Sequence, residues 1–272
     1  MAKKKTVYKI KWKNLFLISI VIIFILTALF FGIKLLSDYN ATKDMVSRFT
    51  NETEVKNIVD DEKTKTIKPD SSLSKFDAYW DYIKLGLIEV DMANLKKINT
   101  DAIGYIEVKG TNFSYPIVQS DNSFYRTHTL DKSDNSFGWI YLDQENSLKD
   151  LDTNTIIYGN KNYFGQLSAS LDVLFENSWK DDNNNYLIKF FTNDHSTLWQ
   201  IISVYHTKDE EHLKRTFQDE TEIETFIDSM LKKTEIKFKG YAKNDDKFLT
   251  ITTNSKGTNL VIQAKLIKIR SE

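Results

Sequence analysis

Cysteine is absent from all 272 residues of this chain. Without a thiol, the protein can form no disulfide, no thiolate metal site and no cysteine nucleophile. The four histidines lie at positions 128, 195, 206 and 212, and no two of them are three or four residues apart. Because paired metal ligands on one helix commonly have that spacing, the sequence predicts no metal site, and no motif indicates a cofactor.

A surplus of positive charge is also lacking once the N-terminus is set aside. The first 36 residues carry seven lysines and no acidic residue, so the formal charge of −1 becomes −8 for residues 37–272. Nucleic-acid binding requires a clustered basic surface. The charge pattern therefore excludes nucleic acid as the expected partner.

The longest uncharged run, residues 14–33, is almost wholly apolar. At 1.5 Å per residue it extends about 30 Å, which matches the hydrocarbon core of a bilayer. Six lysines precede it within residues 1–13, and the positive-inside bias keeps such a terminus in the cytoplasm. We expect a single-pass protein of the cell membrane, with a basic cytoplasmic N-terminus (1–13), a signal anchor (14–36) and an extracellular remainder. A cleaved signal peptide fits less well, because the run exceeds the usual h-region and no small-x-small cleavage site follows it.

The next region, residues 37–72, is polar and poor in apolar residues. We interpret it as a partly helical stalk that ends near the break at Pro69. Residues 73–272 then form the extracellular domain. Its first segment, residues 73–90, has apolar side chains at helical spacing, which predicts a helix that packs on the domain.

Beyond Ala102 the sequence pattern becomes strand-like, and eight short runs favour β structure. They are residues 103–108, 116–119, 139–142, 155–158, 186–191, 198–205, 248–253 and 260–269. Short strands joined by polar connections indicate a closed or nearly closed barrel, here over about residues 98–270. In the last run, apolar even-numbered residues alternate with Val261, Gln263 and Lys265, which predicts one buried and one wetter face.

One helix is expected between the strands. Apolar residues from Ile223 to Leu231 follow the i, i+3, i+4, i+7, i+8 pattern, and Thr221 with Glu224 forms a potential capping box. The predicted fold class is therefore mainly β: an eight-stranded barrel with helical insertions, preceded by a transmembrane helix and a helical stalk.

Five short segments occur in a distinctive order. They are INTDAIGYI (98–106), YPIVQ (115–119), DN (121–122), GWIYLD (138–143) and IIYGN (156–160). Together with the helix before the last two strands, and over about residues 93–269, they resemble the class B sortases. The resemblance implies a sortase-type eight-stranded barrel.

Class B sortases are membrane-anchored enzymes that cut a sorting motif in an exported protein and join the new carboxyl end to a cell-wall or pilus amine. The reaction uses a cysteine nucleophile, a histidine that exchanges protons and an arginine that stabilises the oxyanion or holds the substrate. By the resemblance, these catalytic positions correspond to Asn254, Asn160 and Asn259. None of the family's catalytic residues is therefore intact.

Each replacement removes a different chemical capacity. The amide of Asn254 is a poor nucleophile, Asn160 does not titrate near neutral pH, and Asn259 carries no fixed positive charge. We therefore interpret the chain as an inactive sortase-like protein, a pseudoenzyme that acts as a binding, scaffold or regulatory module in surface-protein or pilus anchoring. The candidate peptide-binding residues are these asparagines and Thr253. Candidate partners are a sorting-motif peptide, an active sortase and a pilus or surface protein.

Three other interpretations stay open. An active enzyme would need a hydroxyl nucleophile from Ser255, Thr252 or Thr253 and a base such as His128 or His206. Alternatively, the sequence of the cleft has changed freely since activity was lost, and the cleft binds nothing. Deliberate replacement is a weaker alternative, since alanine or serine is the usual choice.

Overall fold

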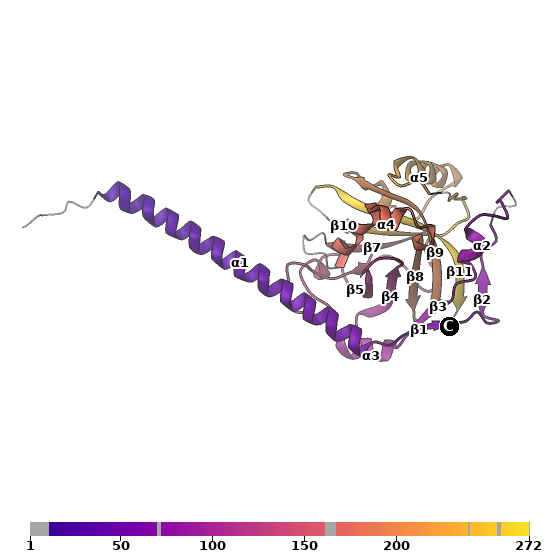
Figure 1. Ribbon diagram of the computed structural model, residues 1–272, viewed down its shortest axis with the longest axis horizontal. Helices are drawn as coiled ribbons and strands as arrows, with labels where there is room; N and C mark the ends of the chain where they lie inside the picture. The colour runs from indigo at the N-terminus through magenta and orange to yellow at the C-terminus, as the bar shows by residue number, and fades with distance from the viewer. Residues whose placement is uncertain (1–10, 70–71, 161–166, 239, 255–256, 272) are drawn as a thin grey trace, which may run out of the picture.

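The computed structural model describes residues 11–69, 72–160, 167–238, 240–254 and 257–271. Within these ranges the chain forms a large β-sheet with short helices around it and one long helix that projects from it (Figure 1). The helices are α1 (Trp12–Glu52), α2 (Tyr79–Tyr82), α3 (Met92–Ile98), α4 (Asn177–Lys180) and α5 (Glu220–Lys233), with 3-10 helices η1 (Phe124–Arg126), η2 (Leu167–Phe175), η3 (Asn183–Asn185) and η4 (Glu211–Leu213). The strands are β1 (Val55–Ile58), β2 (Thr64–Thr66), β3 (Leu87–Val90), β4 (Ala102–Val108), β5 (Ser114–Gln119), β6 (Tyr141–Leu142), β7 (Asn154–Asn160), β8 (Leu187–Thr192), β9 (His195–Thr207), β10 (Phe248–Asn254) and β11 (Asn259–Ser271).

The sheet closes on itself. Its strands follow the order β10-β7-β6-β5-β4-β8-β9-β11, and β11 pairs back onto β10. The described chain thus contains an eight-stranded barrel, and each of the eight predicted strands overlaps one of its members, which confirms the predicted architecture. The pairs β7–β10 and β5–β6 are parallel, whereas the other pairs are antiparallel. Strand β2 extends the sheet along the end of β11, beyond the residues that pair with β10.

Both faces of β11 are buried, so the expectation of a wetter face is wrong. Ile262 points into the barrel core with Ile251 and Val204, its partners on β10 and β9. The opposite face carries Gln263 and Lys265, which are 0% and 3% exposed. That face is covered because α5 packs on Ile202 of β9 and Phe248 of β10, and Tyr241, in the segment after α5, lies against Lys265 with its ring centroid 3.5 Å from the ammonium nitrogen.

Helix α5 confirms the predicted helix, but its cap lies two residues earlier than expected. Asp219, not Thr221, is the N-cap residue, and its carboxylate accepts a hydrogen bond of 2.9 Å from the backbone N–H of Glu222. The Glu222 carboxylate in turn accepts a bond of 2.6 Å from the N–H of Gln218. An Asp-x-x-Glu pair therefore does the capping that was assigned to Thr-x-x-Glu.

The prediction of a helix over residues 73–90 is wrong. Only α2 is α-helical there, and β3 pairs with β1 in a separate two-stranded sheet. Gly86 separates α2 from β3, and a Cβ at that position would lie 2.6 Å from the carbonyl oxygen of Ile58. Glycine permits this close approach of two backbones. Gly86 also marks the break between α2 and β3, where the helix predicted from the sequence does not continue.

The predicted stalk is not a separate element, because several of its residues pack on the domain and others pair with its strands. Its first part continues α1 to Glu52, and the later part supplies β1 and β2. The Lys268 ammonium group of β11 is buried and donates to both carboxylate oxygens of Asp60, at 2.8 and 2.6 Å, and to the carbonyl of Leu85 at 3.0 Å. These bonds fix the segment after β1 to the barrel.

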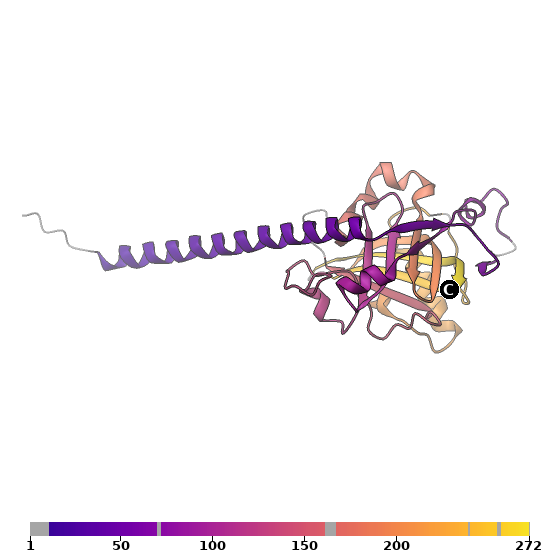
Figure 2. The ribbon, with the colours of Figure 1, turned by 90° about the horizontal axis from the view of Figure 1, so that it is seen from below.

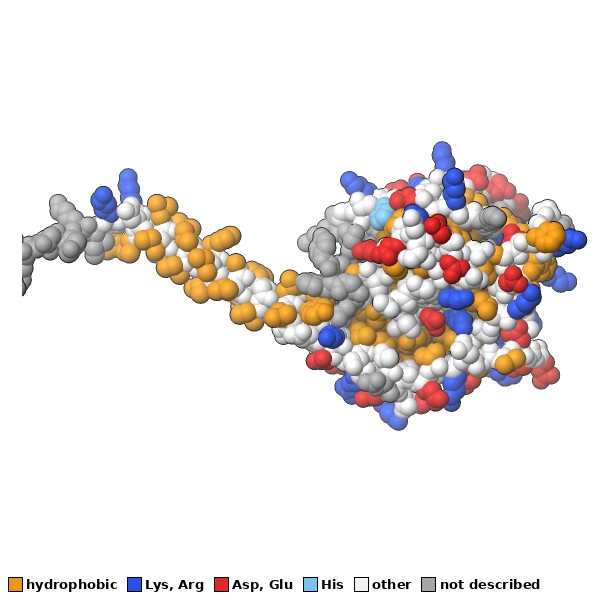
Figure 3. Space-filling model, in the orientation of Figure 1, with side chains coloured by type: hydrophobic (Ala, Val, Ile, Leu, Met, Phe, Trp, Pro, Cys, Tyr) orange, Lys and Arg blue, Asp and Glu red, His pale blue; other side chains and the backbone are white. Residues whose placement is uncertain are grey.

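Helix α1 has two parts with different surroundings. Its most apolar 18-residue stretch has a mean hydropathy of 3.0 and is not buried, so by length and composition this helix can cross a membrane. Figure 3 shows apolar side chains along this projecting part. Further along, Asp38, Thr42, Met45 and Phe49 are all buried. Their spacing of four, three and four residues places them on one face of the helix, against the barrel.

We expect Phe49→Ala to lower the free energy of unfolding by about 3–5 kcal/mol, since it leaves a cavity in a packed aromatic cluster. Phe49 is fully buried, with its ring centroid 5.8 Å from that of Trp139 and 6.0 Å from that of Tyr115. Denaturant titration in detergent, followed by tryptophan fluorescence, measures the change. Phe76→Ala is the control, because Phe76 is 88% exposed and its loss should change little. Equal effects from both variants would contradict the packing of α1 on the barrel.

Candidate functional site

The three asparagines predicted to correspond to the family's catalytic residues meet at one end of the barrel. In the parallel pair of β7 and β10, Asn160 lies directly opposite Asn254. Both residues end their strands, and Asn259 begins β11, the antiparallel neighbour of β10. Parallel strands end on the same side of a sheet, and a strand that returns from one of them begins there. The structure therefore brings these three backbone positions together.

Asn160 holds neighbouring loops in place. Its amide nitrogen donates to the carbonyl oxygen of Arg126 in η1, and the backbone carbonyl of Asn160 accepts a hydrogen bond from the Ser168 hydroxyl. A Cβ on Gly138, which has a φ of +62°, would lie 2.6 Å from the amide nitrogen of Asn160. Glycine suits both the positive φ and the close approach. The half-buried Asn160 side chain thus connects β7 to the segment between β5 and β6.

The other predicted site residues differ in how exposed their side chains are. Thr253 is 2% exposed, and its hydroxyl accepts a hydrogen bond of 2.8 Å from the N–H of Leu260. This bond joins the end of β10 to the start of β11. Asn259 is half-buried and pairs with Thr207 of β9. The side chain of Asn254 and the whole of Ser255 lie outside the described residues.

The two histidines considered as substitute bases have other contacts. His128 stacks on Phe124 at 3.9 Å between ring centroids, and its Nδ1 lies 2.8 Å from the Phe124 carbonyl oxygen. The imidazole of His206 lies 3.2 Å from a carboxylate oxygen of Glu235 and stacks on Phe175. Each ring therefore has its own partners away from the threonines of β10.

A different histidine, His212 of η4, approaches β10. Its Nε2 lies 3.0 Å from the hydroxyl oxygen of Thr252, two residues before Asn254. His212 is 1% exposed, and this burial lowers its pKa to about 4, so the ring is neutral at pH 7. Its Nδ1 has no hydrogen-bond partner within the described part of the chain. Thr252 is itself 2% exposed, so this pair is closed to a peptide in the observed conformation.

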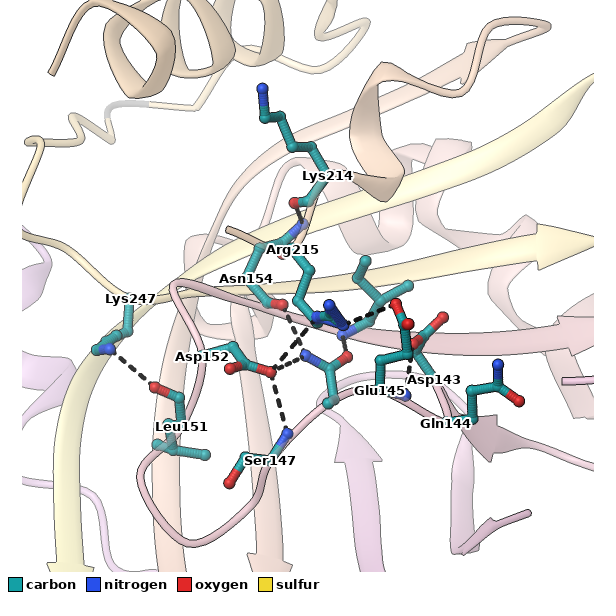
Figure 4. A network of polar contacts seen from close by, with 12 residues as sticks. Asp143, Gln144, Glu145, Ser147, Leu151, Asp152, Asn154, Lys214, Arg215 and Lys247 are labelled. Atoms are coloured by element: carbon teal, nitrogen blue, oxygen red, sulfur yellow. Dashed lines mark hydrogen bonds and ion pairs between the residues drawn. The ribbon is translucent and has the colours of Figure 1, made fainter. Parts of the chain in front are cut away.

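Sequence reasoning missed His212 because its position depends on long-range contacts. The side-chain amide of Asn154, at the start of β7, donates to the carbonyl oxygens of His212 and Lys214, at 3.1 and 2.9 Å. The next residue, Arg215, forms ion pairs with Glu145 at 3.1 Å and Asp152 at 3.9 Å (Figure 4). The network therefore ties η4 to the end of β7 that lies away from Asn160.

A cavity of about 690 Å³ lies on the other side of His212, between η4 and α5. Tyr205 and Gln263 also line it, and the Tyr205 hydroxyl donates to the amide oxygen of Gln263 at 3.1 Å. The described lining includes none of the three asparagines. This cavity is thus separate from the end of the barrel where they meet.

Comparison with known proteins shows which proteins this chain is similar to. No protein-family model matches the sequence. Sortase B of Staphylococcus aureus is 28% identical over 184 residues, which cover 65% of this chain and 74% of that protein. Sortase B of Listeria monocytogenes is 25% identical over 250 residues, or 89% of this chain and 95% of that protein. The chain is class B sortase-like. Among solved structures, a Staphylococcus aureus sortase B–substrate complex has a TM-score of 0.58 at 28% identity, and covers 65% of this sortase-like chain and 84% of its own.

We expect the sortase-like domain to lose stability as the pH falls from about 6.5 to 4, partly through His212. Unfolding restores an ordinary pKa near 6.5, so in this window the unfolded state binds a proton that the folded state does not. The resulting loss of unfolding free energy amounts to about 3 kcal/mol at pH 4, and there is no loss above pH 7.

Denaturant titrations of the wild type and His212→Gln between pH 4 and 7 test this expectation. The glutamine keeps a polar group near Thr252 but does not titrate. The variant should have a shallower dependence of unfolding free energy on pH. Parallel curves for the two proteins would contradict a neutral, buried His212.

Proposed function

We propose that this protein is a membrane-anchored, extracellular sortase-like module that binds a sorting-motif peptide and does not transfer it. The observation that carries the proposal is the register of β7 on β10, which sets Asn160 opposite Asn254. These are the positions that correspond to the family's histidine and cysteine. The register supports the proposal because it places the two positions side by side, and neither asparagine can act as a nucleophile or exchange a proton near neutral pH.

The chemistry supports binding over catalysis. A peptide carbonyl must be attacked by an activated nucleophile, and an amide nitrogen has a delocalised lone pair. The Asn160 amide is also committed to the Arg126 carbonyl, and it exchanges no proton near neutral pH. With Asn259 in the third position, the site can donate and accept hydrogen bonds but cannot form a covalent intermediate.

The hydrogen-bonding groups at this end of the barrel are suited to an extended peptide. Strand ends and side-chain amides can hydrogen-bond the backbone of an extended chain, as in recognition by strand addition. The solved Staphylococcus aureus sortase B–substrate complex supports the same class of ligand for this chain. A peptide held without transfer would make the protein a scaffold or regulator in the anchoring of surface or pilus proteins. An active sortase as the partner is the other possibility within this proposal.

The apolar part of α1 supports the membrane anchor. Lys11 and Lys13 flank its first turn, and four more lysines precede them in the sequence. Such a distribution favours a cytoplasmic N-terminus and an extracellular barrel.

We expect the full chain to leave sorting-motif peptides intact while it binds them. Mass spectrometry of the peptide and of the intact protein would reveal cleavage or a covalent adduct, and calorimetry with the same peptides would measure binding. An adduct that disappears in Thr252→Ala or Ser255→Ala would contradict the proposal and support a hydroxyl nucleophile. Intact peptides with no heat of binding would instead indicate a cleft that no longer binds peptide.

A further inference from the structure

The membrane-type helix α1 is joined to the barrel by a specific set of contacts. Ser136 donates to the Asp38 carboxylate from its backbone N–H at 3.1 Å and from its hydroxyl at 2.6 Å. The Asn135 amide donates to the Asp38 carbonyl at 2.9 Å and to the Thr42 hydroxyl at 3.2 Å. Asp38, Thr42 and Asn135 are all buried. These polar bonds adjoin the packing of Phe49 described above.

No break separates the apolar part of α1 from this docked part. The helix is continuous from Trp12 to Glu52, and no proline or glycine lies between Ile33 and Asp38. Lys34, at the end of the apolar run, forms an ion pair with Asp134 at 3.2 Å. An uninterrupted helix transmits orientation, because its backbone hydrogen bonds hold each turn against the next.

The short distance between the two parts of α1 fixes how far the barrel lies from the bilayer. Asp38 lies five positions after Ile33, so it is at most about 8 Å beyond the apolar run. The headgroup layer on each side of a bilayer is about 5–8 Å thick. Asn135 and Ser136, which contact Asp38, and Asp134, which contacts Lys34, therefore lie at or just above the headgroups.

We propose that residues 127–136, between η1 and β6, form a surface that rests on the lipid headgroups, held there by the docking of α1. The exposed residues of this surface include Thr127, Lys132, Ser133 and Asp134. The proposal rests on the membrane anchor of the proposed function. It adds that the barrel has a fixed orientation and does not swing on a flexible stalk.

The candidate site shares this side of the barrel. Arg126, whose carbonyl holds the Asn160 amide, directly precedes the proposed lipid-facing surface. Strand β11 starts at Asn259 and ends near the C-terminus, on the side of the barrel away from the projecting helix (Figures 1 and 2). A ligand of the three asparagines would therefore bind close to the bilayer surface.

The absence of native cysteine makes a direct test possible. Ser133→Cys and Asp245→Cys, each in the full chain, provide single sites for a fluorophore on the proposed surface and in the loop before β10. Both residues are exposed. The labelled proteins are reconstituted into phosphatidylcholine–phosphatidylglycerol vesicles that contain a lipid with a nitroxide on its headgroup. We expect several-fold stronger quenching at position 133 than at position 245.

A second variant tests the role of the helix. Eight Gly and Ser residues inserted between Leu36 and Ser37 leave every barrel contact of Asp38 and Phe49 in place but free the domain from the membrane segment. We expect quenching at position 133 to fall in this variant. Circular dichroism and tryptophan fluorescence report whether the domain stays folded.

Each other outcome overturns the proposal in a distinguishable way. Weak quenching at position 133 in a protein that resists alkaline extraction would leave the anchor intact and remove the lipid-facing surface. Quenching that the insertion does not change would mean that the helix does not set the height. Release of the protein by alkali would remove both the anchor and this inference, whereas peptide binding is measured independently of the vesicles.

Discussion

The parallel pairing of β7 with β10 is the constraint on which the rest of the structure depends. With β11 it closes the barrel, and its register sets Asn160 opposite Asn254. The end of β10 also lies beside the start of β11, at Asn259. The side-by-side placement of these two strand ends is therefore a property of the backbone. It does not depend on which side chains stand at positions 160 and 254.

Two of the candidate site residues are integrated into their surroundings. Asn160 bonds the carbonyl of Arg126, and the Thr253 hydroxyl bonds the N–H of Leu260, so each supports a connection between strands. A buried donor or acceptor without a partner costs about 1–3 kcal/mol, which favours such bonds at the ends of the strands. The Nδ1 of the neutral His212 differs from this pattern, since it has no hydrogen-bond partner among the described residues.

The sequence predicted the elements whose signal is local. The barrel strands, α5 and the apolar helix each have their own periodicity, and the order of short motifs placed the three asparagines on neighbouring strand ends. Features that depend on long-range contacts were missed. The docked face of α1 includes the polar residues Asp38 and Thr42, which the alternation of apolar residues cannot identify. His212 approaches Thr252 only because Asn154 holds the η4 segment in place. Strand β3 appeared helical since its pairing with β1 cannot be read from its own residues.

The account holds that the barrel retains the transfer geometry and lacks only the reactive groups. Its most direct test is the triple replacement of Asn254→Cys, Asn160→His and Asn259→Arg in the full chain, followed by incubation with a sorting-motif peptide and mass spectrometry of the intact protein. The account predicts a covalent peptide adduct on the introduced thiol, and none on the wild type. A folded triple variant that forms no adduct, or a wild type that forms one equally well, would contradict it.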